Sequence, residues 1–318
     1  MKNIYLNIYK PNFVNLKKAK KNIENNNIIG MPTETVYGLA GNAYSNKSIK
    51  KIFKLKRRPF LNPLIIHFKS LKVLKNDVVL NKNFIKLYKT LCPGPITFIL
   101  NIKKGSKISK IATAGKNTVA VRIPKHKIAR KLLRMLKVPL AAPSANIASK
   151  LSPTSAQDVV EEFGKKIKFV LDGGKCQIGL ESTIVDLTNK PVILRPGSIT
   201  SRKIGKILNK SIGIKKVFKK INAPGQLKLH YSPGIPVKMN RKYAEKNQAF
   251  VRFGKKYKEK ENQFNLSKNG SLKEAANNLY KIMRKIKKKN FKSIAFTKIP
   301  NIGIGRAIND RLKKASAK

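Results

Sequence analysis

The sequence is poor in the residues that build metal sites and disulfide frameworks. It holds two cysteines, Cys92 and Cys176, which stand far apart and outside any CxxC spacing, and only three histidines. A disulfide framework needs several cysteines in an oxidising compartment, and a structural zinc site needs four closely spaced ligands. We therefore expect neither a disulfide nor a protein-built metal site.

Long apolar runs are also missing. No stretch has the roughly 20 apolar residues that a membrane-spanning helix requires, and residues 1–9 lack the basic start and apolar middle of a secretory signal. The expected location is the cytoplasm, with no membrane partner. With 318 residues, 41% of them hydrophobic, the chain can still build one large or two ordinary domains.

Acidic residues are scarce. The chain has 14 Asp and Glu against 71 Lys and Arg, a formal net charge of +57. Such a charge attracts polyanions, with nucleic acid the obvious class. Codon bias is the competing explanation, because lysine, asparagine and isoleucine are all abundant here and all have AT-rich codons. Lysine runs such as 287–289 fit solvated faces and loops, so the charge alone leaves RNA binding and compositional drift open.

Standard nucleotide and catalytic motifs are absent. No Walker A run occurs, and the Gly-x-Gly at 303–305 lacks the third glycine of a dinucleotide fingerprint. There is no HExxH, no Ser/His/Asp order of an esterase and no cysteine–histidine motif. These absences disfavour covalent catalysis and favour a chemistry of substrate positioning and charge neutralisation.

Hydrophobic periodicity mixes helical and strand patterns from position 11 to about 200, which predicts an α/β fold. Several expected strands follow one another without a helix between them, so the sheet should be mixed. Helices are expected at 16–25, 48–56, 83–91, 127–136 and 155–163, and strands at 28–31, 64–68, 96–102, 118–123, 140–142, 169–171 and 182–187.

The pattern changes in the last third of the chain. Residues 215–236 are punctuated by Pro and Gly and show no clear period, which indicates a linker. Beyond them we expect strands at 249–253 and 294–297, a long helix at 272–288 capped by Ser271, and a last helix from 303. The expected organisation is a first domain at 1–214, a linker at 215–236 and a smaller α/β domain at 237–318.

Four short polar clusters lie beside apolar segments of the first domain. They combine hydroxyls, spaced cations, a histidine and turns shaped by Gly and Pro, which together are typical of a site that handles anions. The clusters are 30–39 (GMPTETVYGL), 56–67 (KRRPFLNPLIIH), 143–146 (PSAN) and 179–186 (GLESTIVD).

Four cations stand out by their positions. Lys56 and Arg58 flank Arg57 at a helix end, and with an extended backbone they can converge on one phosphate chain; ordinary surface basicity is the equal alternative. Arg122 and Arg195 each leave an apolar strand just before a proline. Arginine is scarce in this chain, so bidentate anion binding is the stronger interpretation of that pair.

Polar side chains surround these cations in the sequence. Each sits beside a Pro or Gly turn or at a strand start, where turn capping explains any one of them alone, although five together weaken that explanation. They are Thr33, Ser144, Asn146, Ser182 and Thr183.

Three titratable residues near these groups have two possible roles each. His67 ends a buried strand, where a satisfied structural histidine is commoner than a catalyst. Glu34 and Glu181 are notable because acids are rare here. Either could recognise a substrate amine or cap a turn.

The ordered set of motifs resembles the YrdC/Sua5 family. The four clusters follow the family's order, as do 93–95 (PGP), 121–124 (VRIP), 152–154 (SPT), 171–174 (LDGG) and 195–197 (RPG). Residues 230–233 (HYSP) and 303–312 resemble the longer, two-domain Sua5 form, and Arg57 stands where the family usually has a small residue. The resemblance implies a YrdC-like twisted mixed sheet with flanking helices and a smaller, Rossmann-like C-terminal domain.

The resemblance also implies an activity, that of a nucleotidyltransferase. L-threonine, bicarbonate or CO2, and ATP would give L-threonylcarbamoyl-adenylate and pyrophosphate, with Mg²⁺ accompanying ATP. The product would pass to a threonylcarbamoyl transferase machinery that modifies adenosine 37 of tRNAs reading ANN codons. A non-enzymatic RNA-binding protein of the same fold is the alternative, and the polar cluster set favours the enzyme.

The resemblance assigns roles by motif position. Lys56 and Arg58 would be the catalytic cations. The nucleotide would bind to Lys56, Arg58, Ser144, Asn146 and Arg195, supported by Arg122, while threonine and its carbamate would lie among Thr33, Tyr37, His67 and Ser182, under Tyr231 as a lid.

Overall fold

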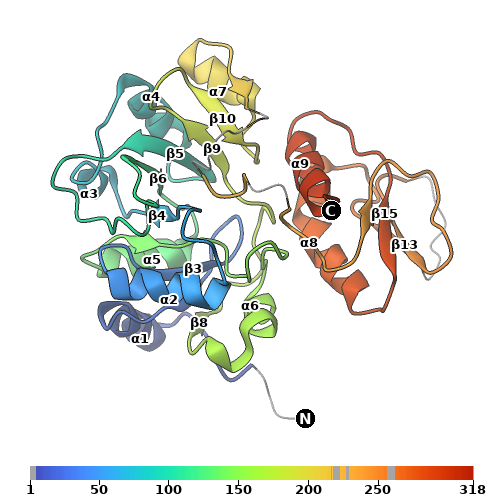
Figure 1. The fold of residues 1–318 in the computed structure, drawn as a ribbon, viewed down its shortest axis with the longest axis horizontal. Coiled ribbons are helices and arrows are strands. Elements are labelled where there is room, and N and C mark those ends of the chain that lie inside the picture. Colours follow the sequence, from blue (N-terminus) through green and yellow to red (C-terminus); the bar gives the residue numbers. More distant parts are fainter. Residues whose placement is uncertain (1–4, 216, 218–222, 227–228, 256–261, 318) are drawn as a thin grey trace.

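The computed structural model describes residues 5–215, 217, 223–226, 229–255 and 262–317. The part that it describes contains two sheets, one of eleven strands and one of four. The smaller unit lies beside the larger one, with α8 and α9 on the side that faces it (Figure 1). Within the expected linker, residues 216, 218–222 and 227–228 lie outside the described residues.

The strands of the larger sheet are β1 (Ile8–Tyr9), β2 (Ile29–Met31), β3 (Gly38–Asn42), β4 (Ile65–His67), β5 (Ile96–Asn101), β6 (Thr118–Arg122), β7 (Leu140–Ala141), β8 (Val170–Leu171), β9 (Thr183–Asp186), β10 (Val192–Arg195) and β11 (Gly213–Ile214). Their helices are α1 (Phe13–Glu24), α2 (Asn46–Lys56), α3 (Leu71–Leu74), α4 (Lys82–Leu91), α5 (Lys127–Met135), α6 (Ala156–Phe163) and α7 (Ser201–Leu208).

The larger sheet is mixed, as the sequence predicts. Its order is β1-β8-β2-β3-β7-β4-β6-β5-β9-β10-β11. Neighbours such as β4 and β6 run parallel, whereas β5 and β6 run antiparallel. The sequence did not predict β3 and α7, nor the short elements β1, α3 and β11. The sequence of β3, GLAGN, is rich in glycine and lacks the β-branched residues that mark a strand.

Helices cover both faces of this sheet. Buried side chains of α2, α4, α6 and α7 form one core with Ile66, Val121 and Val185. Buried side chains of α1 and α5 form a second core on β2, β7 and β8. Because side chains alternate across a strand, the residues before and after Ile66 and Val121 point to the other face. Ile65 and Ala120 form a small apolar cluster there, and His67 and Arg122 line a polar cavity.

The second unit is a small parallel sheet. Strands β12 (Val237–Lys238), β13 (Gln248–Arg252), β14 (Gln263–Asn265) and β15 (Ser293–Phe296) pair in the order β12-β15-β13-β14. Helices α8 (Leu272–Lys287) and α9 (Gly305–Ala315) pack on it, and the side chain of Ser271 caps α8 by accepting from the N–H of Glu274. The core of this unit also contains Leu180 of the first one.

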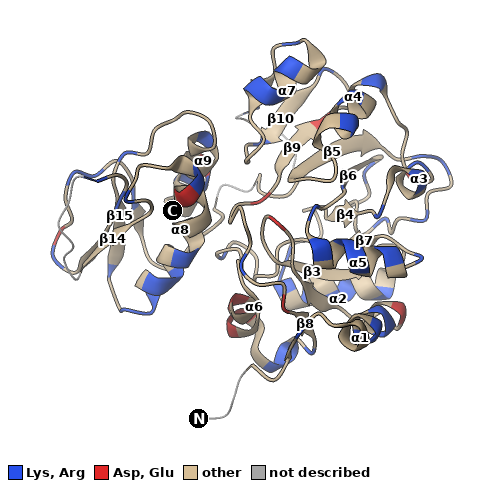
Figure 2. Ribbon diagram, turned by 180° about the vertical axis from the view of Figure 1, so that it is seen from behind, with Lys and Arg blue, Asp and Glu red and all other residues tan. Residues whose placement is uncertain are grey.

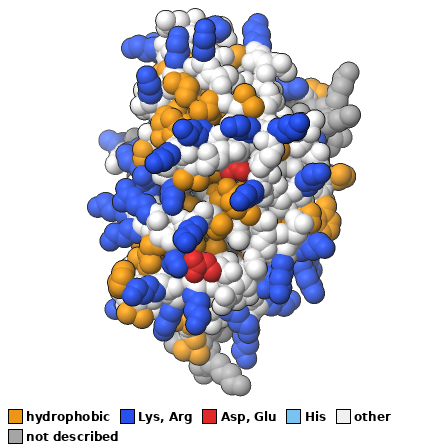
Figure 3. Space-filling model, turned by 90° about the vertical axis from the view of Figure 1, so that its left-hand side faces the viewer, with side chains coloured by type: hydrophobic (Ala, Val, Ile, Leu, Met, Phe, Trp, Pro, Cys, Tyr) orange, Lys and Arg blue, Asp and Glu red, His pale blue; other side chains and the backbone are white. Residues whose placement is uncertain are grey.

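Acidic and basic residues are distributed differently over the helices. Acidic residues gather on α6, whereas lysine and arginine occur on each of the other described α-helices (Figure 2). On the outer face of the larger unit the basic side chains spread over the whole surface rather than forming one patch (Figure 3). Among the residues described, no helix combines the length and the apolar character needed to cross a membrane.

Candidate active site

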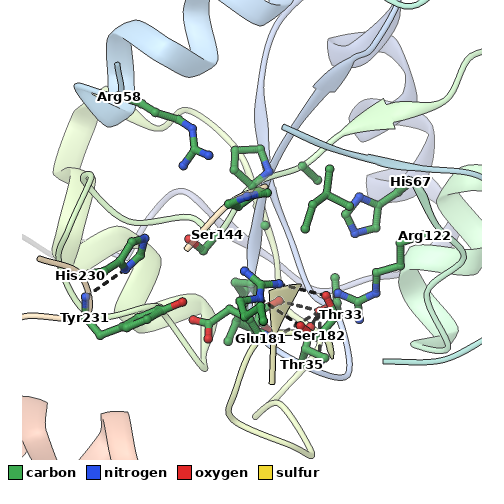
Figure 4. Close-up of a pocket in the computed structure, with 18 residues that line it drawn as sticks. Thr33, Thr35, Arg58, His67, Arg122, Ser144, Glu181, Ser182, His230 and Tyr231 are labelled. Carbon is green, nitrogen blue, oxygen red and sulfur yellow. Dashed lines mark hydrogen bonds between the residues drawn. The ribbon is translucent and has the colours of Figure 1, made fainter. Parts of the chain in front are cut away.

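A small buried cavity lies at the carboxyl ends of the parallel strands β4 and β6 (Figure 4). In parallel sheets this edge is where ligands usually bind. His67 ends β4 and Arg122 ends β6, and the two residues are register partners. The lining residues are Thr33, Thr35, Val36, Tyr37, Gly38, Arg58, Ile65, His67, Arg122, Ala142, Pro143, Ser144, Glu181, Ser182, Arg195, Pro224, His230 and Tyr231.

The cavity gathers most of the residues singled out in the sequence. Nine of the eleven predicted site residues line it, and Lys56 and Asn146 do not. The sequence places these nine in segments up to about 200 residues apart, so the fold brings together what the motifs only suggested. Their individual roles stay predictions.

One wall is a buried ion pair. Arg122 donates to the carboxylate of Glu34 (2.8 Å) and to the hydroxyl of Thr35 (2.9 Å). Burial acts to raise the pKa of Glu34, but Arg122 outweighs it, so that this pKa is lowered. The hydroxyl of Thr33 donates to the carbonyl of Val36 (2.6 Å), which closes the loop between β2 and β3 into a rigid turn.

His67 is a neutral imidazole in this site. Burial, followed by the positive charge of Arg122, lowers the pKa of His67 to about 3. Its Nδ1 is buried and has no hydrogen-bond partner among the described residues. A buried ring nitrogen without a hydrogen-bond partner is unfavourable, and a polar ligand can supply that partner.

Arg58 and Lys56 are both buried, which contradicts the alternative of surface basicity. Arg58 donates to the carbonyls of Asn62 (2.9 Å) and Pro63 (2.8 Å). Lys56 donates to the carbonyls of Ser144 and Asn146. The backbone between the two cations is not extended as expected, because Arg57 is left-handed (φ 49°, ψ 43°) and ends α2.

The Ser144–Asn146 turn therefore rests on Lys56. The amide nitrogen of Asn146 donates to the carbonyls of Ile147 (2.7 Å) and Lys150 (2.9 Å), and its Oδ1 is buried without a partner. Burial, and then the charge of Arg58, lower the pKa of Lys56 well below its usual value. Lys56 and Asn146 thus support the turn that brings Ser144 to the cavity.

Arg195 reaches the cavity through a β-bulge. The register of β10 against β9 shifts between Ile193 and Arg195, and bulges of this type re-aim a side chain. Arg195 then donates to the carbonyl (3.0 Å) and the hydroxyl (3.1 Å) of Ser182. The Ser182 hydroxyl also lies 2.8 Å from that of Thr97.

Tyr37 lines the cavity with its ring, but its hydroxyl is already engaged. The hydroxyl donates to the carbonyl of Gly174 (2.8 Å) and accepts from the N–H of Gly173 (2.9 Å). Burial raises the pKa of Tyr37. The residue thus anchors the loop after β8 to the cavity wall.

Residues of the linker contribute to the cavity wall. Pro224, His230 and Tyr231 all line it. Tyr231 is buried in a left-handed conformation (φ 61°), its ring stacks on Tyr280 of α8 at 5.9 Å, and its hydroxyl has no partner among the described residues. A bulky residue in this conformation is strained. The free volume inside the cavity is about 40 Å³.

The two rare acids have partners that the sequence did not indicate. Glu34 binds Arg122, and Glu181 binds Arg311 of α9 (2.8 Å). Glu181 and His230 line the cavity but were not among the predicted site residues. The rarity of acids was the only signal for Glu181, and its partner lies 130 positions away.

No group of three or more His, Cys, Asp or Glu among the described residues is arranged to hold a metal ion. The two carboxylates near the cavity are both engaged by arginine. The residues present therefore do not fit a metal ion bound by protein ligands alone.

The fold and the cavity define a class: a two-domain α/β protein with a small, arginine-rich cavity at the strand ends of its larger sheet. The family model Sua5_yciO_yrdC, described as "Telomere recombination", matches residues 21–197, and the model Sua5_C, described as "Threonylcarbamoyl-AMP synthase, C-terminal domain", matches 199–317. The chain belongs to the Sua5/YciO/YrdC family, in its two-domain Sua5 form.

Named relatives align over nearly the whole chain. The chain is 38% identical to the threonylcarbamoyl-AMP synthase of Pyrococcus abyssi, with 92% of each chain covered. It is 33% identical to that of Bacillus subtilis, over 95% of this chain and 92% of the relative. A crystal structure of P. abyssi Sua5 complexed with L-threonine matches with a TM-score of 0.88 and 35% identity, over 95% of this chain and 94% of that one.

Proposed function

We propose that this protein is an L-threonylcarbamoyladenylate synthase, a nucleotidyltransferase that makes L-threonylcarbamoyl-adenylate and pyrophosphate from L-threonine, bicarbonate or CO2, and ATP. The observation that carries the proposal is the buried cavity with three arginines and a neutral histidine. It lies in a chain that aligns over 92% and 95% of its length with two threonylcarbamoyl-AMP synthases.

The reaction needs two steps. The threonine amine adds to CO2, forming an N–C bond and releasing a proton, and a carbamate oxygen then attacks the α-phosphorus of ATP. The bond from that phosphorus to the bridging oxygen breaks, and pyrophosphate leaves. Charge develops on the phosphates throughout, so fixed cations are the groups that such a transition state requires.

The cations of the cavity take the nucleotide in this proposal. Arg58 and Arg195 face the phosphates, and Lys56 holds the turn of Ser144 and Asn146 that meets the nucleotide. Arg122 is engaged by Glu34, so it acts as a supporting charge. Guanidinium groups suit this task because their paired N–H donors match phosphate oxygens.

Threonine and its carbamate take the other half of the cavity. Thr33, Tyr37 and Ser182 frame this half, and His67 offers a neutral ring nitrogen without a partner. A neutral imidazole can accept a hydrogen bond from the threonine amine through its unprotonated nitrogen. Tyr231 closes the cavity above them, excluding water from a carbamate and an adenylate that hydrolyse readily.

Mg²⁺ enters this proposal with the nucleotide. Mg²⁺ keeps several waters and binds mainly through substrate phosphates at sites of this type. The two carboxylates near the cavity, Glu34 and Glu181, both bind arginine. They therefore do not form a metal-binding site of their own. We therefore treat MgATP as the substrate.

The proposal extends to the surroundings of the enzyme. The adenylate is consumed by a threonylcarbamoyl transferase machinery acting on adenosine 37 of tRNA, which places the protein in the cytoplasm. The unit 1–214 carries the chemistry, 215–236 the lid and 237–318 the second domain. The charge of +57 supports weak, salt-sensitive tRNA binding without a defined patch.

A single assay tests the activity. Purified protein is incubated with MgATP, L-threonine and labelled bicarbonate, and both pyrophosphate and a labelled adenylate are measured. We expect their release to depend on threonine and on bicarbonate. Pyrophosphate formed equally without threonine would overturn the proposal, whatever the affinity for tRNA.

A further inference from the structure

The side chain of Arg311 on α9, in the second domain, reaches residues that line the cavity. This side chain is 0% exposed. Its Nε donates to the carboxylate of Glu181 (2.8 Å) and its Nη1 to the carbonyl of Pro196 (3.0 Å). Its guanidinium carbon lies 5.0 Å from the centroid of the Tyr231 ring. Two of these partners line the cavity, and the third directly follows Arg195 in the chain.

The negative charge of Glu181 explains why a buried cation such as Arg311 is needed beside the cavity. It is the one carboxylate in the described cavity lining, and it precedes Ser182. The hydroxyls of Ser152 (2.6 Å) and Tyr280 (3.1 Å) also donate to it. Burial acts to raise the pKa of Glu181, but Arg311 and then Arg195 outweigh it, leaving this pKa at about 2. The group is therefore ionised whenever ATP binds.

An ionised carboxylate in the wall of a phosphate site works against binding unless a cation neutralises it. After Arg311, the next cation acting on Glu181 is Arg195. Arg195 is also the cation that we assign to the nucleotide. By engaging Glu181, Arg311 spares Arg195 from pairing with that carboxylate, so that the charge of Arg195 can act on the incoming phosphates.

Contacts between the two domains fix the position of Arg311. The amide of Asn277 on α8 donates to the carbonyls of Cys176 (2.7 Å) and Gln177 (3.0 Å) in the first domain. Gly179 packs so closely that an added Cβ would lie 2.7 Å from the Cα of Asn277. Leu180 is buried in the core of the second domain. The loop that carries Glu181 is thus held between the two domains.

We propose that Arg311 is a positioning residue of the active site and that the second domain contributes it in order to hold Glu181, the Pro196 carbonyl and the Tyr231 ring around bound ATP. The inference rests on the proposed function for the identity of the ligand. It assigns the C-terminal domain a direct part in nucleotide binding rather than the role of an appended module.

The test compares full-length Arg311→Lys, Arg311→Met and the double variant Glu181→Gln/Arg311→Met. Arg306→Met on the same helix is the matched control, because Arg306 is exposed and its Nε donates only to the carbonyl of Asn301 (3.2 Å). Steady-state pyrophosphate release gives kcat and KM for ATP, and calorimetric titration with ATP alone gives a Kd that needs no turnover. All measurements are made well below the melting midpoint of each variant.

We expect kcat/KM for ATP to fall at least about tenfold in Arg311→Lys, which keeps the positive charge but loses the several N–H donors of the guanidinium. In Arg311→Met we expect a fall of about a hundredfold. The double variant also removes the negative charge of Glu181, which Arg311→Met leaves without its partner. Its kcat/KM for ATP should be at least about tenfold higher than that of Arg311→Met. A residue that served only to stabilise the fold would lower the melting midpoint and leave KM and Kd of the folded variant unchanged.

Two results would overturn the inference: an ATP Kd within about twofold of wild type in both single variants, or a double variant no better than Arg311→Met. Failure of the proposed function looks different. In that case the wild-type protein makes no threonine-dependent adenylate, and the order of ATP affinities among the variants still reports on Arg311.

Discussion

Arg57 and Arg58 are neighbours in the chain and lie in opposite environments. Arg57 is exposed, whereas Arg58 is buried, lines the cavity and is held by carbonyls of Asn62 and Pro63. Burial, followed by the charge of Arg195, lowers the pKa of Arg58. The cost of keeping this cation inside is offset when it meets an anion.

We expect Arg58→Ala to lower kcat/KM for ATP by roughly 10- to 100-fold, because a charge-assisted hydrogen bond contributes about 1.5 to 3 kcal/mol. Arg57→Ala is the matched control and should keep the wild-type rate. Steady-state pyrophosphate release measures both. Equal losses in the two variants would show that general positive charge, rather than the buried site, attracts ATP.

At this scale the sequence predicts residue types well and pairings poorly. Arg122, Arg195, His67 and Ser182 could be singled out because they stand beside strands and turns, and all line the cavity. The pairing of Glu181 with Arg311 could not be predicted, because no local sequence pattern links residues that are 130 positions apart.

Among the elements, α2 ends in a conformation that its sequence does not suit. Arg57 adopts a left-handed backbone, where residues other than glycine are disfavoured by about 1 to 2 kcal/mol. We expect Arg57→Gly to raise the free energy of unfolding by about 0.5 to 1 kcal/mol, part of the gain being offset by the greater freedom of glycine in the unfolded chain.

Urea denaturation measures this change. Lys54→Gly is the control, because Lys54 is exposed inside the same helix and glycine there should cost about 1 kcal/mol. If both variants lose stability equally, the left-handed end of α2 is not a point of strain.

The linker is the second element for which we make a prediction. Tyr231 closes the cavity with its ring, while its hydroxyl has no partner among the described residues. Tyr231→Ala should therefore release ATP-derived pyrophosphate with less intact threonylcarbamoyl-adenylate, and Tyr231→Phe should keep the wild-type ratio. The ratio of adenylate to pyrophosphate is the measurement. An unchanged ratio in Tyr231→Ala would leave the segment as a plain tether.

Most helices and strands of the first domain lie within a few residues of their predicted positions, because amphipathic periods and caps such as Asn12 and Ser155 are local signals. Strand β3 was missed because its backbone is held by pairing with β2 and β7 rather than by its own propensity. The short strands β12 and β14 likewise depend on their neighbours in the sheet.

On the scale of the whole molecule, stability should fall in mild acid. Burial is the main cause that lowers the pKa of His67 and of His230 to about 3. Between about pH 6.5 and 3 the unfolded chain binds these two protons and the folded protein does not. Lowering the pH through this window therefore reduces the free energy of unfolding, by about 1.4 kcal/mol per pH unit for each histidine.

Chemical denaturation at several values between pH 7 and 5 measures this slope. In the His67→Gln/His230→Gln variant, the slope of the free energy of unfolding against pH should decrease by the contribution of about two protons, even if the stability at pH 7 also differs. A slope that the double variant leaves unchanged would mean that both histidines are protonated in the folded protein. Glu181, with its pKa at about 2, adds to the loss only below its ordinary pKa near 4.5.

The small free volume of the cavity has a kinetic consequence. Its volume of about 40 Å³ holds only about three water molecules, whereas pockets for ligands of nucleotide size span about 300 to 1,000 Å³. ATP can therefore enter only a conformer that has already opened. In stopped-flow binding the observed rate constant should level off as ATP is raised, at a plateau equal to the opening rate, and Tyr231→Ala should lift that plateau.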